Sequence, residues 1–462
     1  MPAALAVLFY LIGACENARR AAVIGFVFGM TFFVCGLWWI FGALSGYIGL
    51  PILAAAPVML LLCVALSFYP ALAAAVGGRI GGVAGVFAAA GAWAIAEWLR
   101  GILFSGFPWL AVAYSQPPQS PIYGFLPVFG VTGANLILAL LAALSAVFFR
   151  LRYRHKAAAL SAAVVILGAG GFLTQREWTT PAGEVSVSLL QGNVQQELKW
   201  RKGAVQTALS DYLRMAKESS AQWIILPETA LPMRAEDLPD GYWELLQETA
   251  GDGAVLAGMF VEDNNDWFNA AVVIDDNADD YRKRHLTPYG EYLPFADVLS
   301  PILLAADIPY NNLLAGEKTE PLQLPGGLAA VSICYEDIFS HEWREQLPEA
   351  QVLINITNDG WFDGSAMLRQ HVQMSQARAA EFGRFLARAT NTGMTALIDN
   401  KGRIVEQLPP GEQLALHGKI ILRNGATPYV RYGEWPALLS SVLLIVAAIL
   451  FRYYRKETSA VS

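Results

Sequence analysis

The sequence has few charged residues for its length. Only 15% of its 462 residues are Asp, Glu, Lys or Arg, whereas 55% are hydrophobic. A water-soluble protein of this size carries about 25% charged residues, so the composition argues against an ordinary soluble protein. A membrane protein is the interpretation that fits.

Acidic residues are almost absent from the first part of the chain. Residues 1–180 contain Glu16, Glu97 and Glu177, and the other 36 of the 39 acidic residues come later. The chain therefore divides between a lipid environment and an aqueous one. We expect membrane helices in 1–180, a catalytic domain in 183–424, a last membrane helix in 433–452 and a cytoplasmic tail in 453–462.

The chain also lacks a basic stripe and a set of paired cysteines. Its net charge is −7, which argues against nucleic acid as a partner. Three cysteines, Cys15, Cys35 and Cys63, lie in apolar runs, and Cys334 alone lies in the polar region. A disulfide within that region is excluded, so Cys334 is either a buried core residue or a reactive one.

Six apolar windows are long enough, or nearly so, to cross a bilayer core about 30 Å thick. They are residues 21–45, 48–76, 80–99, 122–149, 157–174 and 433–452. Residues 1–14 are short for a span, and Arg19 and Arg20 follow them, whereas a signal peptide has its basic residues first. We interpret this segment as a further membrane helix that begins abruptly.

Basic residues predict the orientation. They cluster at 19–20, at 150–156 and at 452–456, which the positive-inside rule assigns to the cytoplasm. The polar region then lies on the opposite, periplasmic side of a bacterial inner membrane.

The polar region predicts a single α/β domain. Apolar runs typical of strands alternate with helical patterns at 204–217 and 367–385, as in a sheet covered by helices. The clearest strands are 185–190, 223–226, 254–260, 270–274, 328–334, 352–357 and 395–398.

Three stretches place a functional side chain at or just past the end of such a run, where loops of a rigid sheet present catalytic groups. The first ends in Pro227 and Glu228. A carboxylate held there faces a low-dielectric interior and can serve as a general base, or it can be a helix-capping or ion-paired residue. The second is 281–292, whose cations include Lys283, and it is either a solvated charge run or a shaped loop.

The third stretch ends in Cys334, followed by Glu336 and Asp337 as the first turn of an expected helix. A thiolate facing a helix N-terminus and a lysine would have a lowered pKa, so Cys334 is a plausible nucleophile.

Other catalytic signatures are missing. The sequence has no G-x-S-x-G, H-E-x-x-H, C-x-x-C or glycine-rich phosphate loop, and its five histidines are scattered. No metal site or cofactor is indicated, and a Cys/His pair stays possible without being signalled.

Together the stretches resemble the nitrilase, or carbon-nitrogen hydrolase, superfamily, which uses Glu, Lys and Cys in that order on an αββα sandwich. More narrowly, the whole chain resembles the apolipoprotein N-acyltransferase family. Besides the triad, the resemblance rests on 97–100, 106–110, 114–116, 198–200, 285–294, 333–336 and 358–362. The expected fold is thus a polytopic helical membrane bundle plus an α/β nitrilase-like domain.

The resemblance implies a catalytic triad of Glu228 as base, Lys283 as the cation that stabilises the oxyanion, and Cys334 as nucleophile. By matched position it also implies supporting roles for other residues in orienting the triad or covering the pocket. These are Glu291, Tyr335, Glu336 and Trp200.

The implied reaction is N-acylation of the diacylglyceryl-cysteine of a bacterial apolipoprotein. The implied acyl donor is a phospholipid, typically phosphatidylethanolamine. A monomer is expected by default, because nothing in the sequence signals a symmetric interface. The family pattern has eight spans, so this chain is expected to begin inside the second, with a truncated or misassigned start.

Two alternatives stay open. A membrane-anchored amidase of the same superfamily would have an identical triad but no need for an extensive bundle. A receptor or transporter would place ionisable residues inside its spans, and few are seen here.

Overall fold

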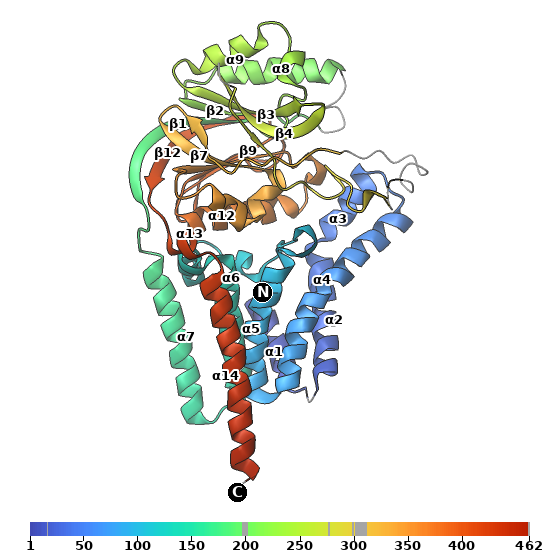
Figure 1. Ribbon diagram of the computed structural model, residues 1–462, viewed down its shortest axis with the longest axis vertical. Coiled ribbons are helices and arrows are strands. Elements are labelled where there is room, and N and C mark those ends of the chain that lie inside the picture. Colours follow the sequence, from blue (N-terminus) through green and yellow to red (C-terminus); the bar gives the residue numbers. More distant parts are fainter. Residues whose placement is uncertain (16, 196–201, 276–277, 298–299, 301–311, 461–462) are drawn as a thin grey trace. The chain divides into compact units, whose positions relative to one another are not determined.

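The computed structural model describes residues 1–462 except 16, 196–201, 276–277, 298–299, 301–311 and 461–462 (Figure 1). The chain forms two compact units, Met1–Glu177 with Thr427–Ser462, and Trp178–Ala426. These borders lie within a few residues of those expected from the acidic residues. We call the first the helical unit and the second the sheet unit.

The helical unit contains the expected spans. Its helices are α1 (Pro2–Ile12), α2 (Ala18–Gly36), α3 (Trp38–Gly42), α4 (Ile52–Ile80), α5 (Gly82–Arg100), α6 (Leu126–Phe148), α7 (Tyr153–Leu173), α13 (Pro428–Tyr432) and α14 (Trp435–Ala460). Among the described residues, six helical segments are long and apolar enough to cross a membrane. They are Ala18–Gly36, Ile52–Ile80, Gly82–Arg100, Pro121–Phe148, Tyr153–Leu173 and Trp435–Tyr454.

The segment expected as a further membrane helix, residues 1–14, is the 11-residue helix α1. At 1.5 Å per residue it is about 16 Å long, roughly half of a bilayer crossing. Its buried side chains include Leu5, Phe9 and Ile12, and it packs on α6, so it belongs to the helical bundle.

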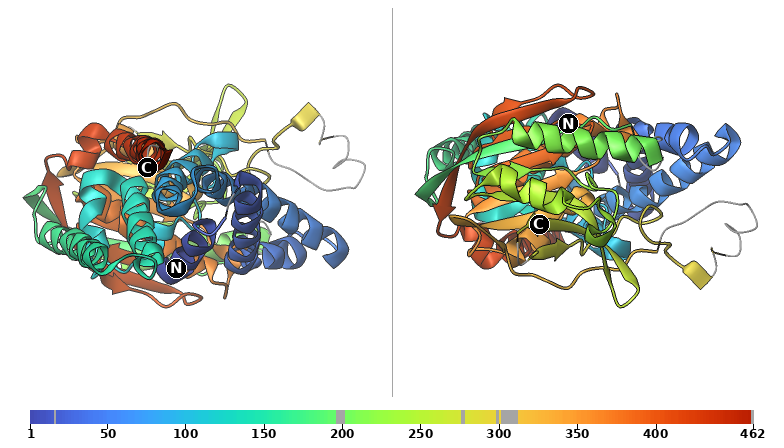
Figure 2. Two further views of the ribbon diagram at one scale, coloured as in Figure 1. Left: turned by 90° about the horizontal axis from the view of Figure 1, so that it is seen from below. Right: turned by 90° about the horizontal axis from the view of Figure 1, so that it is seen from above.

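Helix α5 lies at the centre of the bundle. It packs against α4, α6 and α14, and Figure 2 shows these helices end-on from below. Small residues allow the close approach: a Cβ at Gly91 would lie 2.6 Å from the Ser441 carbonyl oxygen of α14. Such contacts are typical of membrane helices.

The sheet unit contains two six-stranded sheets with helices outside them, an αββα sandwich, and the predicted fold class is confirmed. The first sheet has the order β12-β1-β2-β3-β4-β5 and the second β11-β10-β9-β8-β7-β6. Helices α8 (Lys202–Lys217) and α9 (Tyr242–Ala250) cover the first sheet, and α12 (Met367–Phe382) covers the second (Figures 1 and 2). The short helix α11 (Ser340–Glu345) packs near β7.

The strands of the first sheet are β1 (Thr180–Gln191), β2 (Trp223–Ile225), β3 (Ala254–Asp263), β4 (Asp266–Ile274), β5 (Asp280–Arg282) and β12 (Leu414–Asn424). Those of the second are β6 (Leu322–Leu324), β7 (Gly327–Ile333), β8 (Val352–Thr357), β9 (Leu386–Thr390), β10 (Ala396–Ile398) and β11 (Ile404–Gln407). All seven expected strands are present. The central strands β1, β2 and β3 run parallel, as do β7, β8 and β9.

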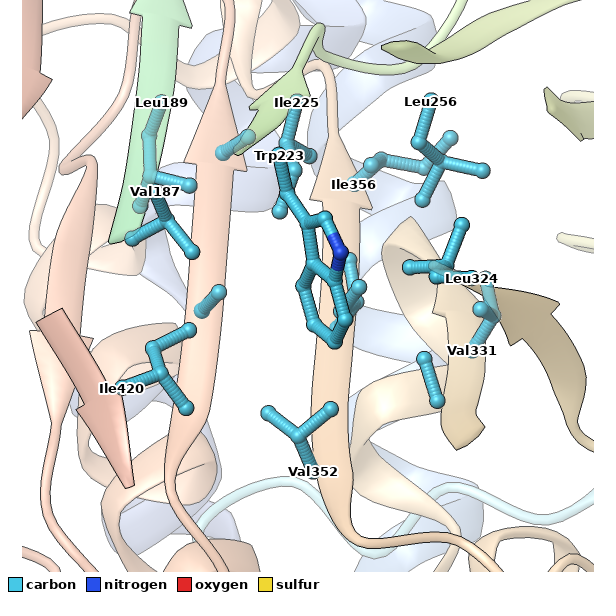
Figure 3. Close-up of a cluster of buried hydrophobic side chains, with 14 of the residues drawn as sticks. Val187, Leu189, Trp223, Ile225, Leu256, Leu324, Val331, Val352, Ile356 and Ile420 are labelled. Atoms are coloured by element: carbon cyan, nitrogen blue, oxygen red, sulfur yellow. The ribbon is translucent and has the colours of Figure 1, made fainter. Parts of the chain in front are cut away.

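The main core fills the space between the two sheets (Figure 3). Trp223 and Ile225 of β2 and Leu256 of β3 meet Val331 of β7 and Val352 of β8 there, all at most 1% exposed. Because parallel strands are buried on both faces, they read as continuous apolar runs, which is why the sequence revealed them. The packed core holds the carboxyl ends of β2 and β7 rigidly.

Candidate active site

Each residue of the expected triad lies within three residues of the end of a strand. Glu228 follows β2, Lys283 follows β5, and Cys334 follows β7. The first two strands belong to one sheet and β7 to the other. The two sheets thus supply the candidate base and lysine on one side and the candidate nucleophile on the other.

Lys283 lies between two carboxylates. Its Nζ is 2.7 Å from Glu291 Oε2 and 3.7 Å from Glu228 Oε1, and its side chain is 1% exposed. Burial alone would lower the pKa of Lys283, but the two carboxylates outweigh burial and raise that pKa above its ordinary value. The lysine is therefore a fixed positive charge.

Glu291 is held as an anion. Burial would raise the pKa of Glu291, but the charge of Lys283 and hydrogen bonds keep it below its ordinary value. Its Oε2 accepts the backbone N–H of Thr287 at 2.8 Å, and its Oε1 accepts from Asn269 Nδ2 at 2.9 Å. Glu291 thus contacts the lysine from a fixed position, and its role in orienting the lysine stays a prediction.

Both oxygens of Glu228 accept hydrogen bonds. Asn269 Nδ2 donates to Oε1 at 2.8 Å, and the backbone N–H of Asn358 donates to Oε2 at 2.8 Å. Asn269 thus joins Glu228 to Glu291, while Asn358 joins Glu228 to the second sheet. A base whose two oxygens are fixed in this way is pre-oriented.

Cys334 is half-buried and has a left-handed backbone, with φ 54°. For a residue with a side chain this conformation is strained, and such strain is typical of functional turns. The following turn, η6 (Cys334–Ile338), is a five-residue 3₁₀ turn in place of the expected α-helix. No full helix begins at the thiol.

The expectation of a lowered thiol pKa is wrong. Burial and the carboxylates of Glu228, Asp359 and Glu291 raise the pKa of Cys334 well above its ordinary value, and Lys283 offsets them only in part. The resting thiol is therefore protonated. A nucleophile in this state needs a base that removes its proton during attack.

Glu336 connects the loop that carries Lys283 to the turn that carries Cys334. Its Oε2 accepts the backbone N–H of Ile333 at 2.7 Å, next to the thiol, and its Oε1 accepts those of Arg284 at 2.6 Å and His285 at 3.0 Å, next to the lysine. The carboxylate is 1% exposed. Its position suits it to fix the distance between the lysine loop and the cysteine turn.

Tyr335 and Trp200 complete the expected set. The ring of Tyr335 packs edge-on against Phe339, with centroids 5.1 Å apart, and against His285 at 5.8 Å. Trp200 lies outside the described residues. Of the seven residues, the structure therefore brings the triad, Glu291 and Glu336 into one connected group, with Tyr335 at its edge.

Two further residues of the site are Asn269, which the sequence did not predict, and Asn358, which it predicted only within the matched segment 358–362 and without a role. Asn269 is a polar residue in the middle of the apolar strand β4, and it is 3% exposed. Asn358 follows β8 directly, as Cys334 follows β7. The strand-end rule applied to β8 would have found Asn358, and a buried amide within an apolar run is a signal for Asn269.

Comparison with known families covers most of the chain. Residues 186–420 match the carbon-nitrogen hydrolase family, and residues 1–144 match the apolipoprotein N-acyltransferase N-terminal domain. Two similar proteins, both named apolipoprotein N-acyltransferase, come from Nitrosomonas europaea and Chromobacterium violaceum. The first is 40% identical over 96% of this chain and 91% of its own length, and the second is 38% identical over 99% and 90%.

Part of the chain is also similar to a solved structure. XC1258 from Xanthomonas campestris, a CN-hydrolase superfamily protein, is 16% identical, covers 56% of this chain and 97% of its own, and superposes with a TM-score of 0.39.

Proposed function

The chain belongs to the apolipoprotein N-acyltransferase family, and from that premise we propose that it acylates the N-terminal diacylglyceryl-cysteine of bacterial apolipoproteins through a thioester on Cys334. It is an acyltransferase and a multi-pass membrane protein. The proposed donor is a phospholipid, with phosphatidylethanolamine the typical case. The observation that carries the proposal is that the Cys334 thiol lies near the carboxylate of Glu228, which two hydrogen bonds hold, and near the buried Lys283.

The first half-reaction forms the thioester. Glu228 takes the proton of the Cys334 thiol while the sulfur attacks the carbonyl carbon of a phospholipid acyl ester. A tetrahedral oxyanion forms, and the fixed charge of Lys283 stabilises it by a few kcal/mol, as expected for a preorganised group in a partly dry site. The intermediate collapses, the ester C–O bond breaks, and the lysophospholipid alkoxide takes the proton from Glu228.

The second half-reaction consumes the thioester. The neutral α-amino group of the apolipoprotein's cysteine attacks the thioester carbonyl and gives a proton to Glu228. The second oxyanion again faces Lys283, and its collapse breaks the C–S bond and forms an amide. The sulfur recovers the proton, so the enzyme returns to its starting state.

Lipid substrates would explain why the enzyme needs a membrane-spanning helical unit. Acyl chains stay in the bilayer, so the thiol has to be held at its surface by a membrane anchor. We place the protein in the inner membrane with the sheet unit on the periplasmic side, acting as a monomer. In support, α7 begins at the basic residues 150–156 and ends just before the sheet unit in the sequence. The apolar span Trp435–Tyr454 of α14 begins after that unit and ends among the basic residues 452–456.

Intact mass spectrometry tests the proposal. The purified full chain is incubated with phosphatidylethanolamine and no acceptor, beside the Cys334→Ala variant. A hydroxylamine-labile gain of one acyl chain, absent from the variant, is the expected result. If neither protein gains mass and the phospholipid stays intact, the phospholipid-dependent mechanism is wrong, and hydrolysis of small amides by the same triad becomes the hypothesis to test.

A further inference from the structure

A buried arginine that the mechanism does not use lies in the second sheet. Arg388 is in the middle of β9, and its side chain is 0% exposed. Its Nη1 donates to Asn355 Oδ1 at 2.6 Å, and its Nη2 donates to Asp359 Oδ2 at 2.9 Å. A buried guanidinium requires such partners, but their location next to the active site requires an explanation of its own.

Nη2 of Arg388 is connected to the candidate base Glu228 through Asp359 and Asn358. Asp359, which it binds, directly follows Asn358, whose backbone N–H donates to Glu228 Oε2 at 2.8 Å. His371 Nδ1 lies 3.2 Å from the other oxygen of Asp359. Asp359 is thus held from two sides, and the amide that orients the base is fixed with it.

Nη1 of Arg388 is connected to the candidate nucleophile Cys334 through Asn355 and Asp337. Asn355, on β8, donates from Nδ2 to Ser332 Oγ at 2.9 Å and to the carbonyl oxygen of Cys334 at 3.5 Å. Nη1 of Arg388 also lies 3.5 Å from Asp337 Oδ2, within the turn that Cys334 begins. A single planar group therefore contacts the supports of both reacting side chains.

Charge reinforces this geometry. Burial would raise the pKa of Asp359, but Arg388 and His371 outweigh it and keep that pKa below its ordinary value. Asp359 is thus an anion near the thiol, together with Glu228 and Glu291, and Lys283 is the opposing cation. The positive charge of Arg388, which pairs with Asp359, offsets part of the negative charge around the thiol.

We propose that Arg388 is a positioning residue, which sets the spacing between Glu228 and Cys334 by holding Asn358 through Asp359 and the cysteine turn through Asn355 and Asp337. The consequence for acyl transfer rests on the proposed function. The consequence for the thiol does not, because reactivity toward a small alkylating reagent needs no lipid.

The chain offers a matched control in Arg384. This arginine is also 0% exposed and precedes the same strand, but it donates to the backbone carbonyls of Ala350 at 2.9 Å and Gly425 at 2.6 Å. These acceptors are backbone atoms outside the groups that support the triad. Replacing Arg384 therefore tests the cost of losing a buried arginine without disturbing the base or the thiol.

The experiment compares Arg388→Met and Arg388→Lys with Arg384→Met and Arg384→Lys in the full-length protein in detergent. Two rates are measured per folded molecule, using the fraction folded from thermal unfolding. One is alkylation of Cys334 by iodoacetamide, followed by intact mass, and the other is single-turnover acylation by phosphatidylethanolamine at varied lipid concentration.

Arg388→Met is expected to lower the maximal acylation rate about 100-fold, the effect of a displacement near 1 Å, with the half-saturating lipid concentration unchanged. Alkylation also slows, because the loss of the Arg388 charge leaves the anion of Asp359 uncompensated, and that anion disfavours the thiolate of Cys334. Arg388→Lys retains the charge but loses the planar fork, so both rates fall to intermediate values. Both Arg384 variants keep wild-type rates per folded molecule.

Equal losses in the 384 and 388 variants, or wild-type rates in both 388 variants, would overturn the positioning role. Should Arg388→Met not fold, Arg388→Lys against Arg384→Lys decides in the same way. Absence of acylation in the wild type would refute the proposed donor chemistry instead, and the alkylation comparison would still decide the role of Arg388.

Discussion

The buried charge pair of the helical unit and the charged residues around Lys283 in the sheet unit are built in different ways. Among the described residues of the helical unit, the buried charged side chains are Glu97 and Arg100, which pair at 2.7 Å within one turn of α5. In the sheet unit, Lys283 pairs with Glu228 from a different strand of the sheet and with Glu291 from its own loop. One pair is made by a helix alone, whereas the other exists only after the sheets have formed.

The difference shows what each unit requires of its fold. An i,i+3 pair forms wherever the helix forms, so its partners are fixed by local geometry. The charge cluster of the sheet unit needs several strand ends to be held at a fixed spacing. A buried charge that loses its partner is costly, so the cluster links catalysis to stability.

Replacing Lys283 is the strongest test of this comparison. Lys283→Met removes the oxyanion's cation, and the rate of acyl-enzyme formation should fall about 10³-fold, since such a group contributes a few kcal/mol. It also leaves two buried carboxylates without a counterion, which should cost roughly 3–5 kcal/mol of unfolding free energy. Single-turnover acylation and chemical unfolding measure the two effects.

A double variant separates the two effects. Lys283→Met with Glu291→Gln removes one of the stranded charges, so it should recover part of the stability and none of the acylation. Lys419→Met is the control, because Lys419 also pairs with a carboxylate, Glu184, but on the surface. Full acylation in the Lys283→Met variant would show that the lysine does not stabilise the oxyanion.

Replacing Glu228 should move thiol acidity and catalysis in opposite directions. The charge of Glu228 helps to raise the pKa of Cys334, so Glu228→Gln removes a charge that disfavours the thiolate. The thiol pKa then falls, and the midpoint of the pH profile of iodoacetamide alkylation shifts to lower pH. Acyl-enzyme formation should nevertheless drop at least about 100-fold, because the general base is lost.

Glu244 is exposed, so Glu244→Gln is the matched control for that change of charge. It should leave the pH profile of alkylation and the rate of acyl-enzyme formation at their wild-type values. A midpoint that rises in Glu228→Gln would show that Glu228 does not act on the thiol through its charge.

The sequence predicted features that depend on neighbouring residues along the chain better than features that depend on contacts formed on folding. Apolar runs identified the six membrane helices and all but one of the parallel strands, and the strand-end rule found Glu228, Lys283 and Cys334. Strand β9 was missed because Arg388 interrupts its apolar run. That arginine is stabilised by polar partners from β8, the loop after β8, α12 and η6, which only folding brings together. No pattern along the chain predicts this arrangement.

The thiol pKa shows the same limit. Lys283 was correctly expected to lower it, but the carboxylates that raise it come from three separate loops. Their combined effect depends on distances in the folded state, and the short η6 turn supplies no helix to oppose them. The direction of the shift in the Cys334 pKa therefore could not be predicted from a sequence motif.

A glycine pair in the helical unit provides the smallest test. A Cβ at Gly25 of α2 would lie 2.6 Å from both the Cβ of Ala74 and the carbonyl oxygen of Pro70, whereas a Cβ at Gly168 of α7 meets nothing within 4 Å. Gly25→Ala should cost roughly 1–3 kcal/mol by overpacking, while Gly168→Ala should be neutral or stabilising by up to about 1 kcal/mol, since alanine favours helix. Thermal unfolding in detergent measures both. Because neither position touches the sheet unit's charge cluster, Cys334 alkylation per folded molecule should match wild type, and a change in it would mean that the two units do not bury their charges independently.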